Sequence, residues 1–353
     1  MTRVAIRVDA HHQIGYGHLK RCLVLGKAFQ ANDVEVSFLL AGDDLAKELA
    51  ITEGFPCKVV PGEANFSKQA ETLVDDIPDG VSMIVTDIAH PLALKDSEDL
   101  EAYFETIQKR YKHVAIDGSG EVSLRQGLLT VACDVLVSPY VGETEAEKLV
   151  PYDELLGADY FILGEEYSAD HARDIRPAAN RVLVTSGGSD PIFVTADVLS
   201  ALALCTDDIL DVKVIIGPGF KCDYVEGLRT LANKLTHQLT FIIAPDNLAK
   251  EMFGCDLAIS TSGLTKYELA ATGTPTILMS IDHHHHYVNQ SFSSKGSVID
   301  LGVAEDVSST ALADCIMALL WESKTRKKQS IAGQNLVDGN GAYRLARSII
   351  NLA

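Results

Sequence analysis

The sequence predicts an α/β protein built from two similar Rossmann-like halves. In each half, short apolar runs alternate with longer segments whose apolar residues recur three and four positions apart, which is typical of βα units and a mainly parallel sheet. Each half also opens in the same way, with an apolar strand that runs into a glycine turn and then a helix. The chain has 353 residues, 47% of them hydrophobic, which is enough for two ordinary cores.

A polar, charged stretch between the halves breaks this rhythm and predicts a linker at residues 166–180. We therefore expect a Rossmann-like domain at residues 1–165, which holds the candidate catalytic turn, and a second one at residues 181–340. A last helix is expected at residues 341–353, with the N-terminal domain as a candidate packing partner. The expected strands are residues 4–8, 34–40, 58–60, 81–86, 113–117, 133–137 and 160–163, then 181–185, 212–216, 239–243, 257–260 and 276–279.

The turn between the first strand and the first helix is the candidate active site. Gly15 and Gly17 can take backbone angles closed to other residues and let a ligand approach the main chain, beside helix N–H groups that suit an anion. His18 and Arg21 lie three residues apart on one helix face, where an imidazole could act as a base beside a cation. A plain glycine-rich turn with a solvated histidine would show the same spacing.

Polar side chains also follow other strands of the first half. Asp9, Asp87 and Asp117 stand at the ends of three expected strands, and residues 138–140 stand at the end of a fourth. In open parallel sheets, ligands bind beyond the carboxyl ends of the strands, so these groups are expected to converge on one edge. Each aspartate could instead only cap the helix that follows it.

The second half carries its own ligand pattern at a strand-to-helix junction. Ser262, Gly263 and Thr265 offer main-chain and hydroxyl donors to a diphosphate, and Gly188 lies in the glycine turn that opens this half. Glu268 follows one and a half helical turns after Gly263, where its carboxylate could accept hydrogen bonds from a ribose diol. The alternative is a solvated glutamate on an ordinary helix.

Charge and cysteine usage exclude several classes of protein. The formal net charge of −19 argues against nucleic acid or an anionic membrane as the main partner. The seven cysteines are scattered, with no CxxC pair, and predict reduced core residues in a cytoplasmic protein. With no run of about 18 apolar residues and no leader pattern after Met1, we expect neither a membrane span nor secretion.

The four consecutive histidines at residues 283–286 could in principle bind a metal. Adjacent side chains cannot all point one way, and no second cluster with ligand spacing completes such a site. We therefore expect a solvated or substrate-facing loop, no metal and no cofactor, with Asn289 and Gln290 on the helix that follows.

Several blocks, taken in order over nearly the whole chain, resemble one family. They are Asp9 with residues 14–18 and Arg21, then residues 187–191, Ser262 with Gly263, Tyr267 with Glu268, residues 273–275, Asn289 with Gln290, and residues 338–342. The chain thereby resembles the UDP-sugar hydrolase of pseudaminic acid biosynthesis and its spore-coat polysaccharide relatives.

This resemblance implies a GT-B-like fold, in which two Rossmann-like domains face a cleft and the nucleotide binds mostly to the C-terminal domain. It implies metal-independent hydrolysis of UDP-2,4-diacetamido-2,4,6-trideoxy-β-L-altropyranose to UDP and the free sugar, with His18 activating the water. The expected substrate-binding residues are Asp9, Gly15, Tyr16, Gly17, Arg21, Asp87, Asp117, Gly188, Ser262, Gly263, Thr265, Glu268, Asn289 and Gln290.

The chain departs from the family pattern on the side expected to hold the sugar. After the fourth strand it reads Asp87-Ile88-Ala89-His90 where an aspartate-x-tyrosine is expected, and Asp117-Gly118 replaces paired aspartates. These departures leave open which amino sugar is used. Two other classes compete with hydrolysis, a glycosyltransferase of the same fold and a non-catalytic nucleotide-sugar-binding protein.

Overall fold

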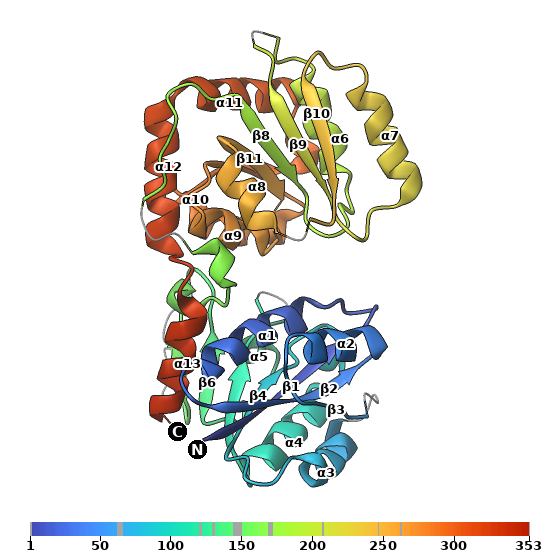
Figure 1. The fold of residues 1–353 in the computed structure, drawn as a ribbon, viewed down its shortest axis with the longest axis vertical. Coiled ribbons are helices and arrows are strands. Elements are labelled where there is room, and N and C mark those ends of the chain that lie inside the picture. Colours follow the sequence, from blue (N-terminus) through green and yellow to red (C-terminus); the bar gives the residue numbers. More distant parts are fainter. Residues whose placement is uncertain are drawn as a thin grey trace. The chain divides into compact units, whose positions relative to one another are not determined.

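The computed structural model describes residues 2–61, 66–119, 122–128, 131–143, 150–168, 172–206, 208–245, 247–261 and 263–352. The chain divides into two compact units (Figure 1). Unit 1 comprises Met1–Gly164 together with Asn340–Ala353, and unit 2 comprises Glu165–Gly339. Each unit is an α/β sandwich in which helices cover both faces of a parallel sheet.

Unit 1 is organised around a seven-stranded sheet in the order β3-β2-β1-β4-β5-β6-β7, in which every pair is parallel. The strand order reverses between β1 and β4, so the connections after these two strands leave on opposite faces and open a crevice for ligands at the carboxyl ends. The strands are β1 (Arg3–Ala10), β2 (Glu35–Gly42), β3 (Cys57–Val59), β4 (Met83–Asp87), β5 (Lys112–Ile116), β6 (Val135–Ser138) and β7 (Asp153–Leu156).

Alternate residues of the strands in unit 1 pack into two apolar layers, one on each face of the sheet. Val36, Phe38 and Leu40 lie in the layer beneath α1, α2 and α13, whereas Leu39 and Ala41 lie in the layer beneath α3 and α4. This is the alternation expected of a strand buried on both faces. The helices are α1 (Gly17–Gln30), α2 (Asp44–Thr52), α3 (Phe66–Asp76), α4 (Ser97–Gln108), α5 (Leu124–Gly127) and α13 (Gly341–Leu352).

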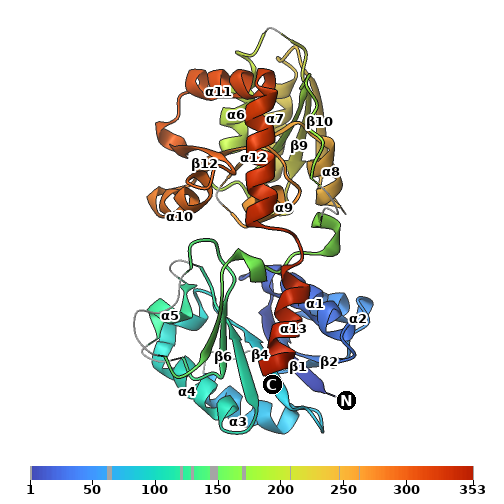
Figure 2. The same ribbon diagram turned by 90° about the vertical axis from the view of Figure 1, so that its left-hand side faces the viewer.

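Helix α13 belongs to unit 1 although it ends the chain. It lies along α1 (Figure 2) and buries Leu345, Ala346 and Ile349 in the layer shared with α1 and β1. Its first residue, Gly341, is closely packed, because a Cβ there would lie 2.2 Å from the carbonyl oxygen of Phe161. The last helix therefore completes the core that the first strand begins.

Unit 2 repeats the arrangement with a six-stranded parallel sheet in the order β10-β9-β8-β11-β12-β13. Its order reverses between β8 and β11, which are the strands that precede the two predicted ligand loops of this half. The strands are β8 (Arg181–Thr185), β9 (Asp211–Ile216), β10 (Gln238–Ile243), β11 (Leu257–Thr261), β12 (Thr276–Ser280) and β13 (Ile299–Val303).

The helices of unit 2 also divide between two layers. α6, α7 and α11 pack on one face of the sheet, and α8 and α9 pack on the other. The helices are α6 (Val194–Leu202), α7 (Cys222–Ala232), α8 (Leu248–Gly254), α9 (Thr265–Ala271), α10 (His283–Ser293), α11 (Ser309–Trp321) and α12 (Ser323–Leu336).

Three local expectations differ from the structure. Residues 160–163 are not a strand, and the seventh strand of unit 1 is instead β7, while β13 adds an unexpected edge to unit 2. Both unexpected strands lie at sheet edges and carry half-exposed polar residues, so they lack a continuous apolar run. The histidine run is not a loop but the first turn of α10, because the Asp282 side chain accepts the His285 N–H at 2.8 Å and caps the helix.

Part of the expected linker packs on unit 2. The Arg173 guanidinium donates to the carbonyl oxygens of Thr272 and Phe253, both at 3.1 Å, and Arg176 binds Asp256 at 2.6 Å. The described residues of this stretch therefore form part of unit 2, which begins at Glu165.

Candidate functional site

The turn between β1 and α1 lies at the point where the strand order of unit 1 reverses. Gly15 has φ +80° and its N–H donates to the His11 carbonyl at 2.8 Å, so this position favours glycine. Gly17 is the first residue of α1 and has no positive φ, so of the two glycines only Gly15 uses a backbone angle closed to other residues. Among the described residues no side chain caps α1, and Tyr16, just before it, donates its hydroxyl to Asp43 at 2.8 Å.

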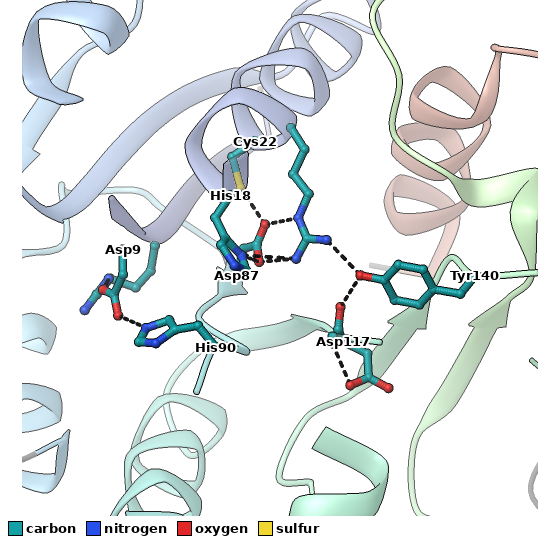
Figure 3. Close-up of polar contacts among 10 residues, drawn as sticks. Asp9, His18, Cys22, Asp87, His90, Asp117 and Tyr140 are labelled. Carbon is teal, nitrogen blue, oxygen red and sulfur yellow. Dashed lines mark hydrogen bonds and ion pairs between the residues drawn. The ribbon is translucent and has the colours of Figure 1, made fainter. Parts of the chain in front are cut away.

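His18 and Asp87 form the central pair of this site (Figure 3). His18 stands in the first turn of α1, and Asp87 ends β4, the strand adjacent to β1. Nδ1 of His18 lies 2.7 Å from Oδ1 of Asp87. The Asp87 side chain has no exposed surface, whereas 21% of the His18 side chain is exposed. The histidine therefore faces solvent while its partner is fixed in the interior.

Arg21 and Cys22 complete the surroundings of the Asp87 carboxylate. Arg21 Nε donates to Oδ2 at 2.5 Å and its Nη2 donates to Oδ1, so the guanidinium binds both oxygens. The Cys22 thiol donates to Oδ2 at 3.3 Å. Burial alone would raise the pKa of Asp87, but Arg21 and then His18 lower it well below its ordinary value. Asp87 is therefore an ionised carboxylate with four protein donors.

The ionised carboxylate fixes the tautomer of His18. A carboxylate only accepts hydrogen bonds, so the short contact requires the proton on Nδ1. The neutral ring then carries its lone pair on Nε2, and among the described residues no protein group is bonded to that atom. Asp87 also stabilises the positive charge that arises when Nε2 takes up a proton. The geometry is that of a general base with its orienting carboxylate.

A second histidine and aspartate lie beside this pair. Nε2 of His90 is 2.7 Å from Oδ2 of Asp9, and Nδ1 of His90 accepts the Ala93 N–H at 3.2 Å. Both ring nitrogens of His90 are therefore used within the protein. Arg7, which is buried, donates to the other oxygen of Asp9. His90 and Asp9 form a fixed wall next to His18, whose ring centre lies 6.1 Å from that of His90.

Asp117 is buried and holds the connection after β5 in place. Its carboxylate accepts the Gly118 and Leu124 N–H groups at 2.8 and 2.5 Å and the Ser138 hydroxyl at 2.5 Å. Burial raises its pKa, and these donors oppose that rise. Asp117 and Asp87 stay predictions as substrate-binding residues, and in the structure both carboxylates are buried and accept hydrogen bonds from protein donors.

The glycine turn that opens unit 2 is closely packed. Gly187 has φ +71°, and the Gly188 carbonyl accepts the Gly219 N–H at 2.8 Å. A Cβ at Gly217 would lie 2.4 Å from that carbonyl, so the turns after β8 and β9 touch through their main chains. Gly188 itself is exposed. Asp190, just beyond, accepts the Val194 N–H at 2.9 Å and fixes the start of α6.

The second predicted ligand loop lies between β11 and α9. Gly263 is exposed and Thr265 begins α9, whereas Ser262 lies outside the described residues. Glu268 is half-buried and accepts a hydrogen bond from the Tyr167 hydroxyl. Burial and then the Glu268 carboxylate raise the pKa of Tyr167. Tyr167 was not expected from the sequence, because it stands a hundred residues away in the polar stretch.

The two amides expected on the following helix differ in position. Gln290 is exposed on α10, but Asn289 is buried, where it accepts from Lys266 Nζ at 2.8 Å and donates to the Ser280 hydroxyl at 2.9 Å. Lys266 is itself buried, which lowers its pKa to about 8. A weak sign of this contact is visible in the sequence, where Lys266 stands among the apolar residues of a predicted helix.

The histidine run makes local contacts. His285 binds Asp282 at 2.7 Å, and His286 Nδ1 lies 2.8 Å from Asp300 on β13. Within the described ranges, no three side chains of His, Cys, Asp or Glu are grouped so that they could hold a metal ion. No helix in the same ranges is long and apolar enough to cross a membrane.

Solved structures share the architecture over essentially the whole chain. MurG of Acinetobacter baumannii aligns with a TM-score of 0.71 at 14% identity, covering 99% of this chain and all of that one. The UDP-GlcNAc 2-epimerase of Neisseria meningitidis, bound to UDP-GlcNAc, aligns with a TM-score of 0.70 at 9% identity, covering 99% of this chain and 100% of that one. The chain has the GT-B fold. No protein-family model matches the GT-B chain.

Three curated proteins are similar to this GT-B chain in sequence. The Bacillus subtilis spore coat polysaccharide biosynthesis protein SpsG is 29% identical over 199 residues, or 56% of this chain and 58% of SpsG. An uncharacterized Methanocaldococcus jannaschii protein is 26% identical over 78% of this chain and 55% of its own length. The UDP-2,4-diacetamido-2,4,6-trideoxy-beta-L-altropyranose hydrolase of Campylobacter jejuni is 25% identical over 76% of this chain and 88% of that enzyme. The chain thus spans little more than half of the first two relatives.

Proposed function

We propose that the protein hydrolyses a UDP-activated diacetamido-trideoxy sugar, of the kind used for nonulosonic acids or surface polysaccharides, to UDP and the free sugar. The observation that carries this proposal is the His18–Asp87 pair, in which a buried carboxylate holds Nδ1 and leaves Nε2 as a base. The resemblance in sequence to the Campylobacter jejuni hydrolase supports the same reaction.

In the proposed reaction, Nε2 of His18 takes a proton from water as the water oxygen bonds to the anomeric carbon. The bond from that carbon to the β-phosphate oxygen breaks, and its electron pair leaves with UDP. Nucleoside diphosphate is a competent leaving group without further protonation, so one well-placed base suffices. Asp87 remains ionised and balances the charge of the imidazolium.

We place the nucleotide on unit 2. Gly188, Gly263 and Thr265 follow the two strands at which its order reverses, where open α/β sheets bind ligands. Their main-chain N–H groups suit a diphosphate, and Glu268 suits a ribose diol. Support comes from the Neisseria meningitidis epimerase, which has the same fold and binds UDP-GlcNAc.

A glycosyltransferase is the second candidate, because MurG shares the fold over the whole chain. In that case the base would take its proton from a sugar hydroxyl instead of water. A non-catalytic binding protein is disfavoured, since binding alone has no use for a histidine oriented by a buried carboxylate.

The deciding experiment measures UDP release from a panel of UDP-amino sugars, with and without sugar acceptors. We expect release without an acceptor, unchanged by exhaustive treatment with EDTA. His18→Ala should lower kcat by about 10² to 10⁴, the usual contribution of a general base, with UDP affinity retained. Release of UDP only with an acceptor would show a transferase. No release from any UDP-sugar would refute the proposal that the protein is an enzyme. A loss on chelation that one divalent ion restores would overturn the metal-free mechanism.

A further inference from the structure

Tyr140 is linked to the His18–Asp87 pair through Arg21, which bonds both Tyr140 and Asp87. It follows β6, and its hydroxyl lies between Arg21 and the main chain of Asp117 (Figure 3). The hydroxyl accepts from Arg21 Nη1 at 3.0 Å and donates to the Asp117 carbonyl at 3.2 Å. The ring is buried, and its centre lies 6.2 Å from that of Phe161.

The Asp117 end of this contact is held by hydrogen bonds. Asp117 is held through its own carboxylate, which ties the connection after β5 to Ser138 on β6. The Tyr140 hydroxyl is therefore bonded to the carbonyl of a residue whose side chain is itself held by hydrogen bonds. With its only proton given to that carbonyl, its lone pairs face Arg21.

The Arg21 guanidinium links the Tyr140 hydroxyl to the Asp87 carboxylate. The guanidinium is planar, and Nε and Nη2 bind the two oxygens of Asp87 while Nη1 binds Tyr140. Because the guanidinium is planar, the bond from Nη1 to Tyr140 fixes the plane of the whole group. The two bonds from Nε and Nη2 then fix the orientation of the Asp87 carboxylate. Oδ1 of Asp87 then points at Nδ1 of His18, at 2.7 Å.

Arg21 also competes with Asp87 for the histidine. Its Nη2 lies 3.3 Å from Nδ1 of His18, so a rotated guanidinium could donate to Nδ1 and force the proton onto Nε2. That tautomer has no lone pair facing solvent and cannot act as a base. Holding Nη1 on Tyr140 keeps Arg21 engaged with the carboxylate.

We infer that Tyr140 is a positioning residue, which acts through Arg21 and Asp87 to keep His18 in its basic tautomer. The expected loss of activity rests on the proposed function, whereas the expected effect on the His18 tautomer does not. It assigns Arg21, expected from the sequence to bind substrate, to the support of the base.

Tyr140→Phe tests this with the ring packing retained. We expect kcat to fall about 10-fold to 10²-fold, the range for a slightly misplaced catalytic group, while KM and UDP affinity stay unchanged. In a His18→Ala background, adding Tyr140→Phe should cause no further loss, because both changes act on one base. Tyr160→Phe, a half-buried tyrosine of the same unit, is the matched control and should match the wild type.

A measurement without substrate separates this inference from the proposed function. ¹⁵N NMR of the histidine ring nitrogens should show His18 with its proton on Nδ1 in the wild type and a mixture of tautomers in Tyr140→Phe. An unchanged tautomer, or a loss of kcat that adds fully to that of His18→Ala, would refute the role of Tyr140. If the wild type hydrolyses no UDP-sugar but the tautomer shifts, the proposed reaction fails and the positioning role stands.

Discussion

At the scale of single residues, the buried Asp87 carboxylate holds three side chains of α1 in place. The carboxylate accepts hydrogen bonds from His18, Arg21 and Cys22. Burial, and then the negative charge of Asp87, raise the pKa of the Cys22 thiol well above its ordinary value. The thiol therefore stays protonated and remains a donor. The sequence could place Asp87 at a strand end, but not show that His18 and Arg21 would reach it from another element.

Asp87→Asn should remove the group that sets the tautomer of His18. We expect kcat to fall about 10³–10⁴-fold, since a neutral amide neither orients the ring nor stabilises its charge. Steady-state assays of folded protein measure this, with Asp75→Asn on the exposed surface of α3 as the control. Activity within a factor of two of the wild type would contradict the assignment.

The same variant has a defined effect on acid stability. The pKa of Asp87 is lower in the folded protein than in the unfolded chain, so Asp87 stabilises the fold above about pH 3.9 and loses that contribution as the pH falls through the folded value. Unfolding of Asp87→Asn by urea should therefore depend less on pH below 3.9 than that of the wild type.

Glu268→Ala should weaken UDP binding by about 1.5–3 kcal/mol, the range for hydrogen bonds to a charged group, because the ribose diol would lose its acceptor. Calorimetric titration with UDP gives this directly. The control is Glu226→Ala, an exposed glutamate on α7. Equal affinity for Glu268→Ala and the wild type would remove Glu268 from the nucleotide site.

At the scale of elements, the interior strands and both glycine turns were predictable, whereas the edges were not. Central strands such as β4 and β11 are buried on both faces and each begins with consecutive apolar residues. β7 and β13 keep polar residues because each lies at the edge of its sheet, so their sequences lack the apolar pattern by which a buried strand is recognised. The histidine run was predicted as a loop for another reason, because the Asp282 side chain that caps its helix was not considered.

Strand β5 contains a histidine that makes the stability of unit 1 sensitive to acid. His113 is buried, its Nδ1 donates to the Ala132 carbonyl at 2.8 Å, and the Thr86 hydroxyl lies 2.9 Å from Nε2. Burial lowers its pKa from 6.5 to about 4, so the folded state holds the neutral ring. This stabilisation is complete above pH 6.5 and is lost as the pH falls to 4.

The expected loss is on the order of 3 kcal/mol at most, from a pKa difference of 2.5 between the unfolded value of 6.5 and the folded value of about 4. Urea unfolding between pH 7 and pH 4 measures it. His113→Gln should show a shallower decline than the wild type, while His283→Gln, on the exposed start of α10, should match the wild type. Identical slopes for His113→Gln and the wild type would refute this account.

At the scale of the whole molecule, the sequence predicted two α/β units but not that residues 172–180 would be fixed to the second. The arginines of that stretch bind carbonyls and the Asp256 carboxylate of unit 2, in contacts between residues 80 and 99 positions apart. A polar, proline-containing stretch has the same composition whether it is free or bound, so composition alone could not decide.

Leu345→Ala tests the dependence of unit 1 on the end of the chain. Leu345 is fully buried beside α1, so the change should lower the unfolding free energy by about 2–5 kcal/mol. Thermal and urea unfolding should show the loss in unit 1, with unit 2 unaffected. Tyr343→Ala, at a half-exposed position of α13, is the control, and a similar small effect of both changes would contradict the packing.

The position of α13 has a consequence for synthesis on the ribosome. Unit 2 is a continuous segment, so all its contacts are available once residue 339 has left the exit tunnel. Unit 1 needs Asn340–Ala353, and its core stays open on the α1 side until those residues have emerged as well. Unit 1 is therefore synthesised first but completes its folding last. A chain truncated shortly before α13 would carry a complete unit 2, whereas its unit 1 would expose an apolar surface to which chaperones bind.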